Sequence, residues 1–301
     1  MGPSLARMVR RASDELGDSR IVYAVSRFSS EEAVRALEAW GVVPVRAELA
    51  DRQALARLPD APNVIYMAGQ KFGTRALPSL TWVSNVVVPS NMAERYRDSR
   101  IVAFSTGNVY PLVPVKGGGA RESEAPAPVG EYAYSCLGRE RVLEHASRSR
   151  GMPVSIVRLN YAVDLRYGVL VDLAVRVMQG ESIDLRMGHV NVIWQGDANA
   201  QAIGCLAHCA VPPFVVNVTG PELLSVRMVA LELGRILGRD PVFVNSEATD
   251  ALLSDTSLAQ SLFGPPTVSA ETLLVWVAEW LRRGGPLLGK ATKFEEREGR
   301  F

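Results

Sequence analysis

The sequence predicts an α/β protein built on a doubly wound parallel sheet and followed by a smaller carboxyl-terminal lobe. Two observations support this fold class. In the first half of the 301 residues, short apolar runs alternate with longer segments of helical periodicity, which is the pattern of strand–helix units around a parallel sheet. The apolar runs contain few polar residues, as expected for strands that helices cover on both faces.

Residues 1–160 are expected to form the first domain, with each strand followed by a helix. Strands are predicted at Ile21–Val25, Val42–Val45, Val64–Met67, Ile101–Phe104 and Val154–Val157. Helices are predicted at Ser30–Trp40, Asp51–Leu58, Leu80–Tyr96 and Glu131–Arg150, the first of them capped by a serine.

Beyond residue 160 the alternation loosens, and residues 161–283 are expected to form a mainly helical lobe interleaved with late strands of the sheet. Helices are predicted near Leu170–Gln179, Ala198–Cys209, Arg227–Leu237 and Ala270–Arg283, with a short apolar piece at Val190–Trp194 and a strand at Phe214–Val218. The tail, residues 284–301, is rich in charge and glycine and is expected to fray.

The composition excludes several kinds of partner. Lys and Arg number 33 against 32 Asp and Glu, a formal net charge of +1, so the chain has no broad positive field for nucleic acid or an anionic membrane. No segment is long and apolar enough to span a bilayer, and the first 16 residues lack the apolar stretch of a secretory signal. The cysteines, Cys136, Cys205 and Cys209, form neither a metal-binding pattern nor an even disulfide set. We expect a cytoplasmic protein with no metal site that binds a small molecule.

Two segments carry residues suited to chemistry on a hydroxyl group. Residues 104–110 read Phe-Ser-Thr-Gly-Asn-Val-Tyr and follow an expected strand; residues 132–144 read Tyr-Ala-Tyr-Ser-Cys-Leu-Gly-Arg-Glu-Arg-Val-Leu-Glu. They resemble the Ser-Ser-x-x-x-Val-Tyr-Gly and Tyr-x-x-Ser-Lys-Leu-x-x-Glu stretches of the extended short-chain dehydrogenase/reductase superfamily, the NAD-dependent epimerases and dehydratases. Weaker matches in the same order extend through nearly the whole chain. The resemblance implies a Rossmann-like fold.

The resemblance also implies a catalytic pair. Tyr132 stands in the place of the family's catalytic tyrosine, and Thr106 in the place of the hydroxyl that binds the reacting substrate oxygen. In the family a lysine four residues after the tyrosine lies on the same helix face, where it lowers the tyrosine pKa and holds the nicotinamide ribose. Cys136 occupies that position here. We hypothesise that Lys71, or alternatively Arg139, supplies the positive charge near Tyr132; the rival interpretation is that Lys71 is an ordinary surface lysine.

The beginning of the family's nucleotide-binding motif is not visible in the sequence. A dinucleotide fold opens with a strand, a glycine-rich turn and a helix that receive the pyrophosphate. This sequence opens at the helix, with Gly2 in the place of the third glycine of the turn. Because the first strand is central in this fold, its absence leaves a gap of about 10 Å between its neighbours. Either the native start lies upstream of Met1, which we favour, or the neighbouring strands have closed up and the pyrophosphate site is lost.

Other residues correspond to the family's cofactor site. Ser26 and Arg27 end the next strand, where an acid would select NAD and an arginine would select NADP. NADP is therefore slightly favoured over NAD. The alternative interpretation, to which we give equal weight, is that Arg27 is only an exposed arginine at the end of a strand. The resemblance places five more residues beside the cofactor, with Glu48 and Leu49 near the adenine, Ala68 and Gly69 near the nicotinamide ribose, and Asn85 on the following helix.

For the substrate, the resemblance implies Asn108 and Asn160 as binding residues. The function it implies is NAD(P)-dependent epimerisation, dehydration or reduction of a nucleotide sugar or a related hydroxyl-bearing substrate, by hydride transfer. The alternative is a catalytically impaired family member that serves as a nucleotide-binding sensor or scaffold. The helices expected at Leu80–Tyr96 and Glu131–Arg150 are those that the family pairs across a two-fold axis, so a homodimer is expected.

Overall fold

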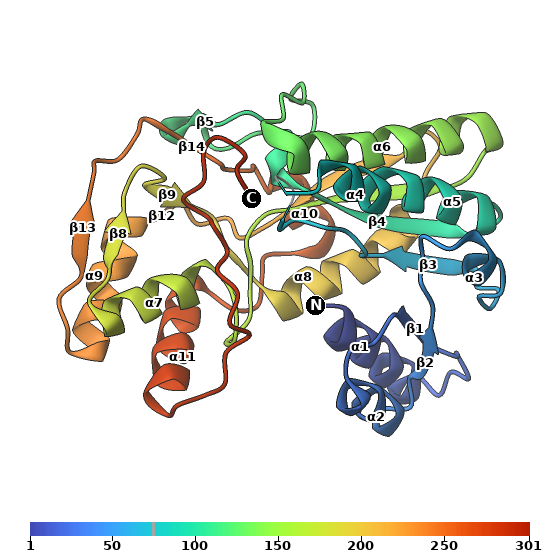
Figure 1. Cartoon of the computed structure of the whole chain (residues 1–301), viewed down its shortest axis with the longest axis horizontal. Helices are drawn as coiled ribbons and strands as arrows, with labels where there is room; N and C mark the ends of the chain where they lie inside the picture. The colour runs from blue at the N-terminus through green and yellow to red at the C-terminus, as the bar shows by residue number, and fades with distance from the viewer. Residues whose placement is uncertain (74–75) are drawn as a thin grey trace.

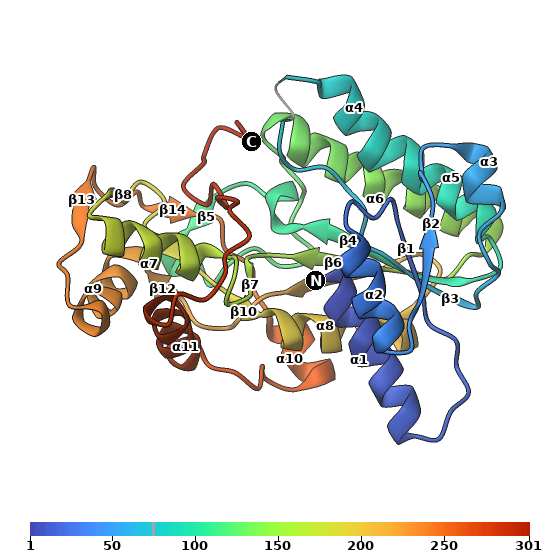
Figure 2. The same ribbon diagram turned by 60° about the horizontal axis from the view of Figure 1, so that its bottom comes forward.

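The structure is a computed structural model that describes residues 1–73 and 76–301. Its main sheet is parallel and has the strand order β11-β6-β4-β3. The bounds are β3 (Asn63–Tyr66), β4 (Arg100–Thr106), β6 (Val154–Leu159) and β11 (Phe214–Val218). Helices cover both faces (Figures 1 and 2), so the predicted doubly wound α/β class is confirmed.

On one face of this sheet lie α5 (Val88–Arg95) and α6 (Gly130–Arg150); on the other lie α1 (Gly2–Glu15) and α8 (Gln195–Gly204) (Figure 2). The helix expected at Leu80–Tyr96 is interrupted. It consists of α4 (Pro78–Trp82), a π-helical stretch η1 (Val83–Val87) and α5. Pro89 lacks a backbone N–H and cannot make the regular helical hydrogen bond, and the wider π turn directly precedes it.

The first two strands form a separate sheet. β1 (Tyr23–Ser26) pairs in parallel with β2 (Val43–Arg46), and neither is hydrogen-bonded to β3. With α2 (Glu31–Ala39) they form a unit that lies below the main sheet in Figure 1; α3 (Arg52–Ala56) leads from it to β3. Within the described residues the strands that would flank a central first strand have therefore not closed up. The expectation that every early strand is buried on both faces is wrong for β1 and β2, which are only half-buried because the sheet is not continuous over them.

The carboxyl-terminal lobe has its own core, in which α7 (Val169–Gln179), α9 (Val226–Leu237) and α11 (Ala270–Arg282) pack together. β8 (Ser182–Asp184) pairs in parallel with β13 (Val242–Val244) at its edge. Short strand pairs and one more helix, α10 (Ser257–Phe263), connect it to the main sheet. These pairs are β5 (Val113–Pro114) with β14 (Asp250–Ala251), β7 (Ala162–Val163) with β10 (Ile193–Trp194), and β9 (His189–Val190) with β12 (Leu224–Ser225).

The tail after α11 does not fray, contrary to the sequence expectation. It crosses the face of the carboxyl-terminal lobe and ends beside the start of α6 (Figure 1). Phe294 is 1% exposed and Phe301 is 4% exposed. These two apolar side chains, spaced among the charged residues, bind the tail to the protein because their burial outweighs the tendency of a charged segment to remain solvated. None of the described helices combines the length and apolar character that crossing a membrane requires.

Candidate active site

The candidate site lies beyond the carboxyl end of β4, where open parallel sheets form their crevice. Thr106 is the last residue of β4, is buried, and accepts a hydrogen bond from the backbone N–H of Asn108 through its Oγ1. Tyr132 lies in the first turn of α6. Burial raises the pKa of Tyr132, and a hydrogen bond with the Thr106 side chain acts in the opposite direction. The structure thus brings together the two hydroxyl groups that the sequence assigned to catalysis.

One turn further along α6, Cys136 is 1% exposed and its side chain is hydrogen-bonded with that of Tyr132. Burial raises the pKa of the Cys136 thiol, so the group is neutral near pH 7. A neutral thiol packed among Val109 and Tyr110 supplies no positive charge to the tyrosine.

Both cations considered from the sequence lie near Tyr132. The Lys71 Nζ is 5.9 Å from the centre of the Tyr132 ring and donates to the backbone oxygen of Thr292 at 3.2 Å. Burial lowers the pKa of Lys71 to about 8, with Cys136 acting in the opposite direction. Arg139 lies behind the site, and its guanidinium lowers the pKa of Tyr132 against the larger effect of burial. Lys71 therefore sits over the tyrosine ring, whereas Arg139 acts from the protein interior.

Arg139 also organises the end of β3. Its guanidinium donates to the backbone oxygen of Phe104 at 2.7 Å and to Asn85 Oδ1 at 2.7 Å. A Cβ at Gly69 would overlap the Arg139 Nη2, so a larger residue there would displace the guanidinium. Asn85 uses all four of its hydrogen-bonding positions within the protein, on Gln70, Ser135 and Arg139. Asn85 thus fixes the loop after Ala68 and Gly69.

The residues assigned to the adenosine end of the cofactor lie on the small β1–β2 sheet. Ser26 ends β1 and is exposed. Arg27 and Glu48 face each other across the strand ends, with 3.6 Å between Nη1 and Oε2 and mostly exposed side chains. Leu49 packs against the core under the main sheet. Gly2 is exposed at the first turn of α1, whose amino terminus is directed toward the centre of the molecule in Figure 1.

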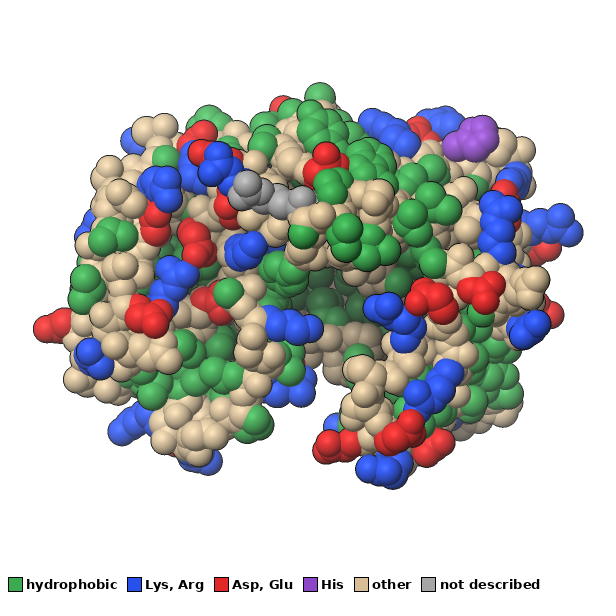
Figure 3. Space-filling model, in the orientation of Figure 1, with side chains coloured by type: hydrophobic (Ala, Val, Ile, Leu, Met, Phe, Trp, Pro, Cys, Tyr) green, Lys and Arg blue, Asp and Glu red, His purple; other side chains and the backbone are tan. Residues whose placement is uncertain are grey.

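Of the two residues assigned to the substrate, Asn108 lines the cavity on the opposite side of the site, whereas Asn160 is buried inside the protein. The Asn160 side chain is 2% exposed and donates to the backbone oxygen of Leu252 and to Asn191 Oδ1, so it ties β6 to the carboxyl-terminal lobe. Asn108 borders a narrow cavity between the end of β4 and the tail. Other residues lining this cavity are Tyr110, Leu252, Glu296, Arg297 and Phe301. The space-filling view shows a hollow between the carboxyl-terminal lobe and the α1–α2 region (Figure 3).

The comparisons with known proteins agree with this geometry. The sequence profile of the NAD dependent epimerase/dehydratase family matches residues 6–163. This chain belongs to that family. A search of the curated proteins found no significant match.

Solved structures of similar fold come from the same group of enzymes. A mutant of UDP-glucuronic acid 4-epimerase of Bacillus cereus is 17% identical, with a TM-score of 0.79 over 94% of this chain and 96% of that chain. dTDP-glucose 4,6-dehydratase of Streptomyces venezuelae is 20% identical, with a TM-score of 0.77 over 94% of each chain. UDP-glucose 4-epimerase of Thermotoga maritima is 20% identical, with a TM-score of 0.75 over 93% of this chain and 96% of that chain. The first two structures contain bound NAD, and the third contains UDP-glucose.

A buried polar cluster, whose partners sequence reasoning did not identify, supports β4 and β6. Arg158 of β6 forms an ion pair with Glu140 of α6 at 2.7 Å and donates to the Tyr110 hydroxyl at 2.7 Å. Ser105 donates to Glu140 Oε1 and the Tyr110 hydroxyl donates to Asn217. Glu140 and Tyr110 could have been noted because both belong to the family motifs. Their partners could not be predicted because Arg158 and Asn217 lie in distant segments of the chain. Sequence reasoning also missed the tail residues Thr292 and Phe301, which contact the site, because a charged tail gives no such indication.

Proposed function

We propose that this protein is an NAD(P)-dependent enzyme that epimerises, dehydrates or reduces a nucleotide sugar or a related hydroxyl-bearing compound. The observation that carries the proposal is the meeting of the Thr106 and Tyr132 side chains just beyond β4. Membership of the epimerase/dehydratase family and the nucleotide sugars named for the similar structures support the substrate class.

In this proposal NAD(P), when bound, would accept a hydride from a carbinol carbon of the substrate or donate one to the corresponding carbonyl carbon. Tyr132 exchanges the proton of the substrate hydroxyl, which is general acid–base catalysis. Thr106 orients the same oxygen by hydrogen bonding. Lys71 provides a positive charge at the mouth of the site, and Arg139 provides a second one from behind, so that together they replace the lysine that Cys136 displaces. A nearby cation favours the ionised phenol and so lowers the tyrosine pKa.

The residues of this chain are better suited to bind the nicotinamide and adenosine ends of the cofactor than the pyrophosphate between them. The loop at Ala68 and Gly69 lies beside Asn85 and Arg139, where a nicotinamide ribose would bind. Arg27 is exposed and able to accept a 2′-phosphate, which favours NADP, while Glu48 corresponds to a residue near the adenine. For the pyrophosphate, the described residues offer the amino terminus of α1 at Gly2, whose unpaired backbone N–H groups favour anions.

The test is a cofactor titration followed by turnover. NAD and NADP are titrated separately by the quenching of protein fluorescence, and UDP-glucose, UDP-glucuronic acid and dTDP-glucose are then supplied with the tighter cofactor. The proposal expects saturable cofactor binding, a transient reduced-nicotinamide absorbance, and a changed sugar detected by chromatography. Absence of cofactor binding in the intact protein would overturn it.

A second candidate function rests on Cys136 and on the separation of β1–β2 from the main sheet. Both are departures from a working dehydrogenase, and they favour a member of the family that binds a nucleotide without turning it over and acts as a sensor or scaffold. The same experiment separates the two candidates. Saturable binding of cofactor and sugar nucleotide without any product would favour the second.

We also propose that the protein is a homodimer and works in the cytoplasm. Within each chain, we propose domain boundaries at residues 160 and 283, as predicted from the sequence. The support for the dimer is an apolar surface on α4, η1 and the start of α6. Its exposed members are Leu80, Trp82, Val87, Val129 and Tyr134. Sedimentation equilibrium of Trp82→Glu beside the unchanged protein tests this surface, and a dimer that survives the charge would argue against it.

A further inference from the structure

The tail crosses the candidate site, and its two halves are held in different ways. Residues 292–297, the root, are fixed to the carboxyl-terminal lobe. Residues 298–301, the tip, lie against the start of α6 and against Tyr132. The root and the tip therefore lie against different parts of the protein.

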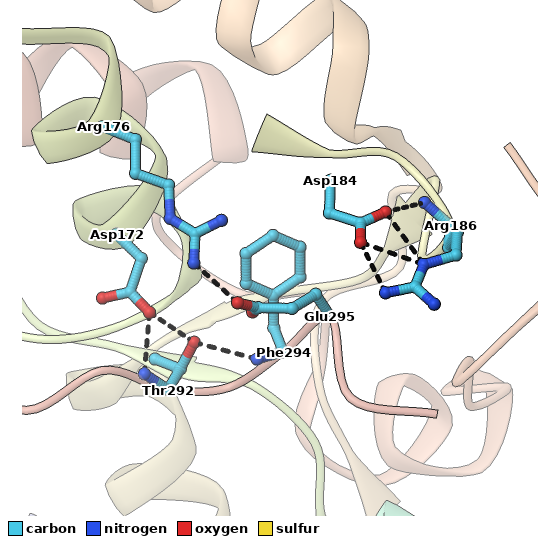
Figure 4. A network of polar contacts seen from close by, with 7 residues as sticks. All are labelled: Asp172, Arg176, Asp184, Arg186, Thr292, Phe294 and Glu295. Carbon is cyan, nitrogen blue, oxygen red and sulfur yellow. Dashed lines mark hydrogen bonds and ion pairs between the residues drawn. The ribbon is translucent and has the colours of Figure 1, made fainter. Parts of the chain in front are cut away.

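The root is anchored by charged and buried contacts. Thr292 donates to Asp172 Oδ2 through its backbone N–H at 2.7 Å and through its hydroxyl at 2.6 Å. Glu295 pairs with Arg176 of α7 at 2.6 Å (Figure 4). The Phe294 ring lies beside the Arg176–Glu295 pair (Figure 4) and is 1% exposed. Arg297 donates to the backbone oxygen of Asp250 at 3.0 Å.

The tip is docked by close packing and by a hydrogen bond from the Lys293 Nζ to the backbone oxygen of Arg300 at 3.4 Å. The ring centres of Phe301 and Tyr132 are 5.4 Å apart in an edge-to-face arrangement, and the Lys71 Nζ lies 4.6 Å from the Phe301 ring centre. Two rings at this separation are in contact and leave no room for another molecule between them. Gly299 has a φ of +71°, and a Cβ there would overlap the Val129 backbone oxygen. Docking therefore requires glycine at 299.

We propose that residues 298–301 form an autoinhibitory lid that fills the substrate side of the candidate site and must swing away before a sugar nucleotide binds. The inference rests on the proposed function for the identity of the substrate. It follows from three contacts on one small segment, since the tip covers the ring of Tyr132, covers the ammonium of Lys71 and borders the cavity beside Asn108. The root keeps the lid attached when the tip is released.

Two variants release the tip and one matched variant leaves it docked. Deletion of residues 298–301 removes the lid and retains the contacts of Phe294 and Arg297. Gly299→Ala retains the whole chain but places a methyl group against Val129, and undocking relieves that clash. Gly289→Ala is the control, because Gly289 lies in the same tail with a φ of +62° and nothing within 4 Å of an added Cβ. It carries the same backbone penalty without affecting docking.

The first measurement is the alkylation rate of Cys136 by iodoacetamide, followed peptide by peptide with Cys209 of the same molecule as internal reference. Cys136 is hydrogen-bonded to Tyr132 beneath the tip. The second is UDP-glucose affinity by calorimetry. Apparent affinity falls in proportion to the fraction of molecules in the competent state, so a tip docked nine-tenths of the time predicts about tenfold tighter binding when it is removed.

The lid is supported if Cys136 alkylation accelerates in the deletion and in Gly299→Ala, with the Gly289→Ala rate unchanged. Equal rates in all four proteins would overturn it. So would weaker UDP-glucose binding in the deletion, because the tip would then hold the sugar instead of excluding it. Accelerated alkylation without UDP-glucose binding in any variant leaves the lid standing and counts against the proposed function.

Discussion

The two ends of the candidate site differ in how deeply their residues are buried. One is the catalytic end at β4, and the other is the adenosine end at β1 and β2. At the catalytic end, β4 is buried along all but its first residue, and the supporting Glu140–Arg158 pair is 4% and 6% exposed. At the adenosine end, β1 and β2 are half-buried, and the Arg27–Glu48 pair is 81% and 53% exposed. The same kind of interaction, an arginine beside a glutamate, therefore stands in two very different environments.

This contrast shows what each end contributes. Buried ionic groups that are all hydrogen-bonded fix the position of β6 against α6, and removal of one partner leaves a charge without compensation. Exposed pairs are screened by water and hold little. We expect the catalytic end to resist local opening and the adenosine end to open at a lower free energy.

The largest effect is expected from Tyr132, which we propose as the catalytic acid and base. Tyr132→Phe removes the hydroxyl that exchanges the substrate proton, so turnover is expected to fall by about 10²–10⁴-fold while the fold is kept. Steady-state rates with the preferred sugar nucleotide measure this. Tyr134→Phe, two residues away and 53% exposed, is the control; an equal loss in both variants would contradict the assignment.

The next prediction compares the two ion pairs directly. Glu140→Gln leaves the Arg158 guanidinium buried without a carboxylate and should cost about 3–5 kcal/mol of unfolding free energy. Glu48→Gln should cost less than about 1 kcal/mol because its pair is exposed. Urea unfolding followed by circular dichroism gives both values. Similar costs would remove the distinction between the two ends.

Lys71 predicts a pH dependence at the catalytic end. Its pKa is lowered to about 8 by burial, so the side chain is a cation below that pH and becomes neutral above it. Activity that depends on this charge should decline at alkaline pH, at about 8 with Lys71 buried as in this structure and at a higher pH once release of the tip exposes it. Lys71→Met should lower kcat/KM about tenfold below pH 8, the equivalent of one pKa unit in Tyr132, and should abolish the decline. Lys290→Met, in the exposed part of the tail, should keep the profile of the unchanged protein.

The smallest effect is expected at the adenosine end. Arg27→Ala should raise the Kd for NADP by about fivefold and leave that for NAD unchanged, since an exposed charge contact contributes up to about 1 kcal/mol. Fluorescence titration with each cofactor measures the ratio. If both Kd values stay constant, Arg27 is only an exposed residue at the end of β1, and the preference for NADP is abandoned.

Much of the fold could be predicted because its signals are local. Each early strand lies within two residues of its expected bounds, since dense apolar runs and serine or aspartate caps are read over a few neighbouring positions. Thr106 and Tyr132 could be named because the residues around them form motifs. The prediction that the tail frays was wrong because Phe294 and Phe301 pack against apolar side chains that are distant in the sequence.

By itself, the sequence determined the α/β class, the positions of the early strands along the chain, and the presence of Cys136 four residues after Tyr132. Only the tertiary structure decided that β1 and β2 stand apart from the main sheet, that Lys71 and Arg139 approach Tyr132 from opposite directions, and that the tail covers the site. The reason is physical. Periodicity and motifs record what a residue needs from its neighbours in the chain, whereas hydrogen bonds such as that from Lys71 to Thr292 join segments that only the folded chain brings together.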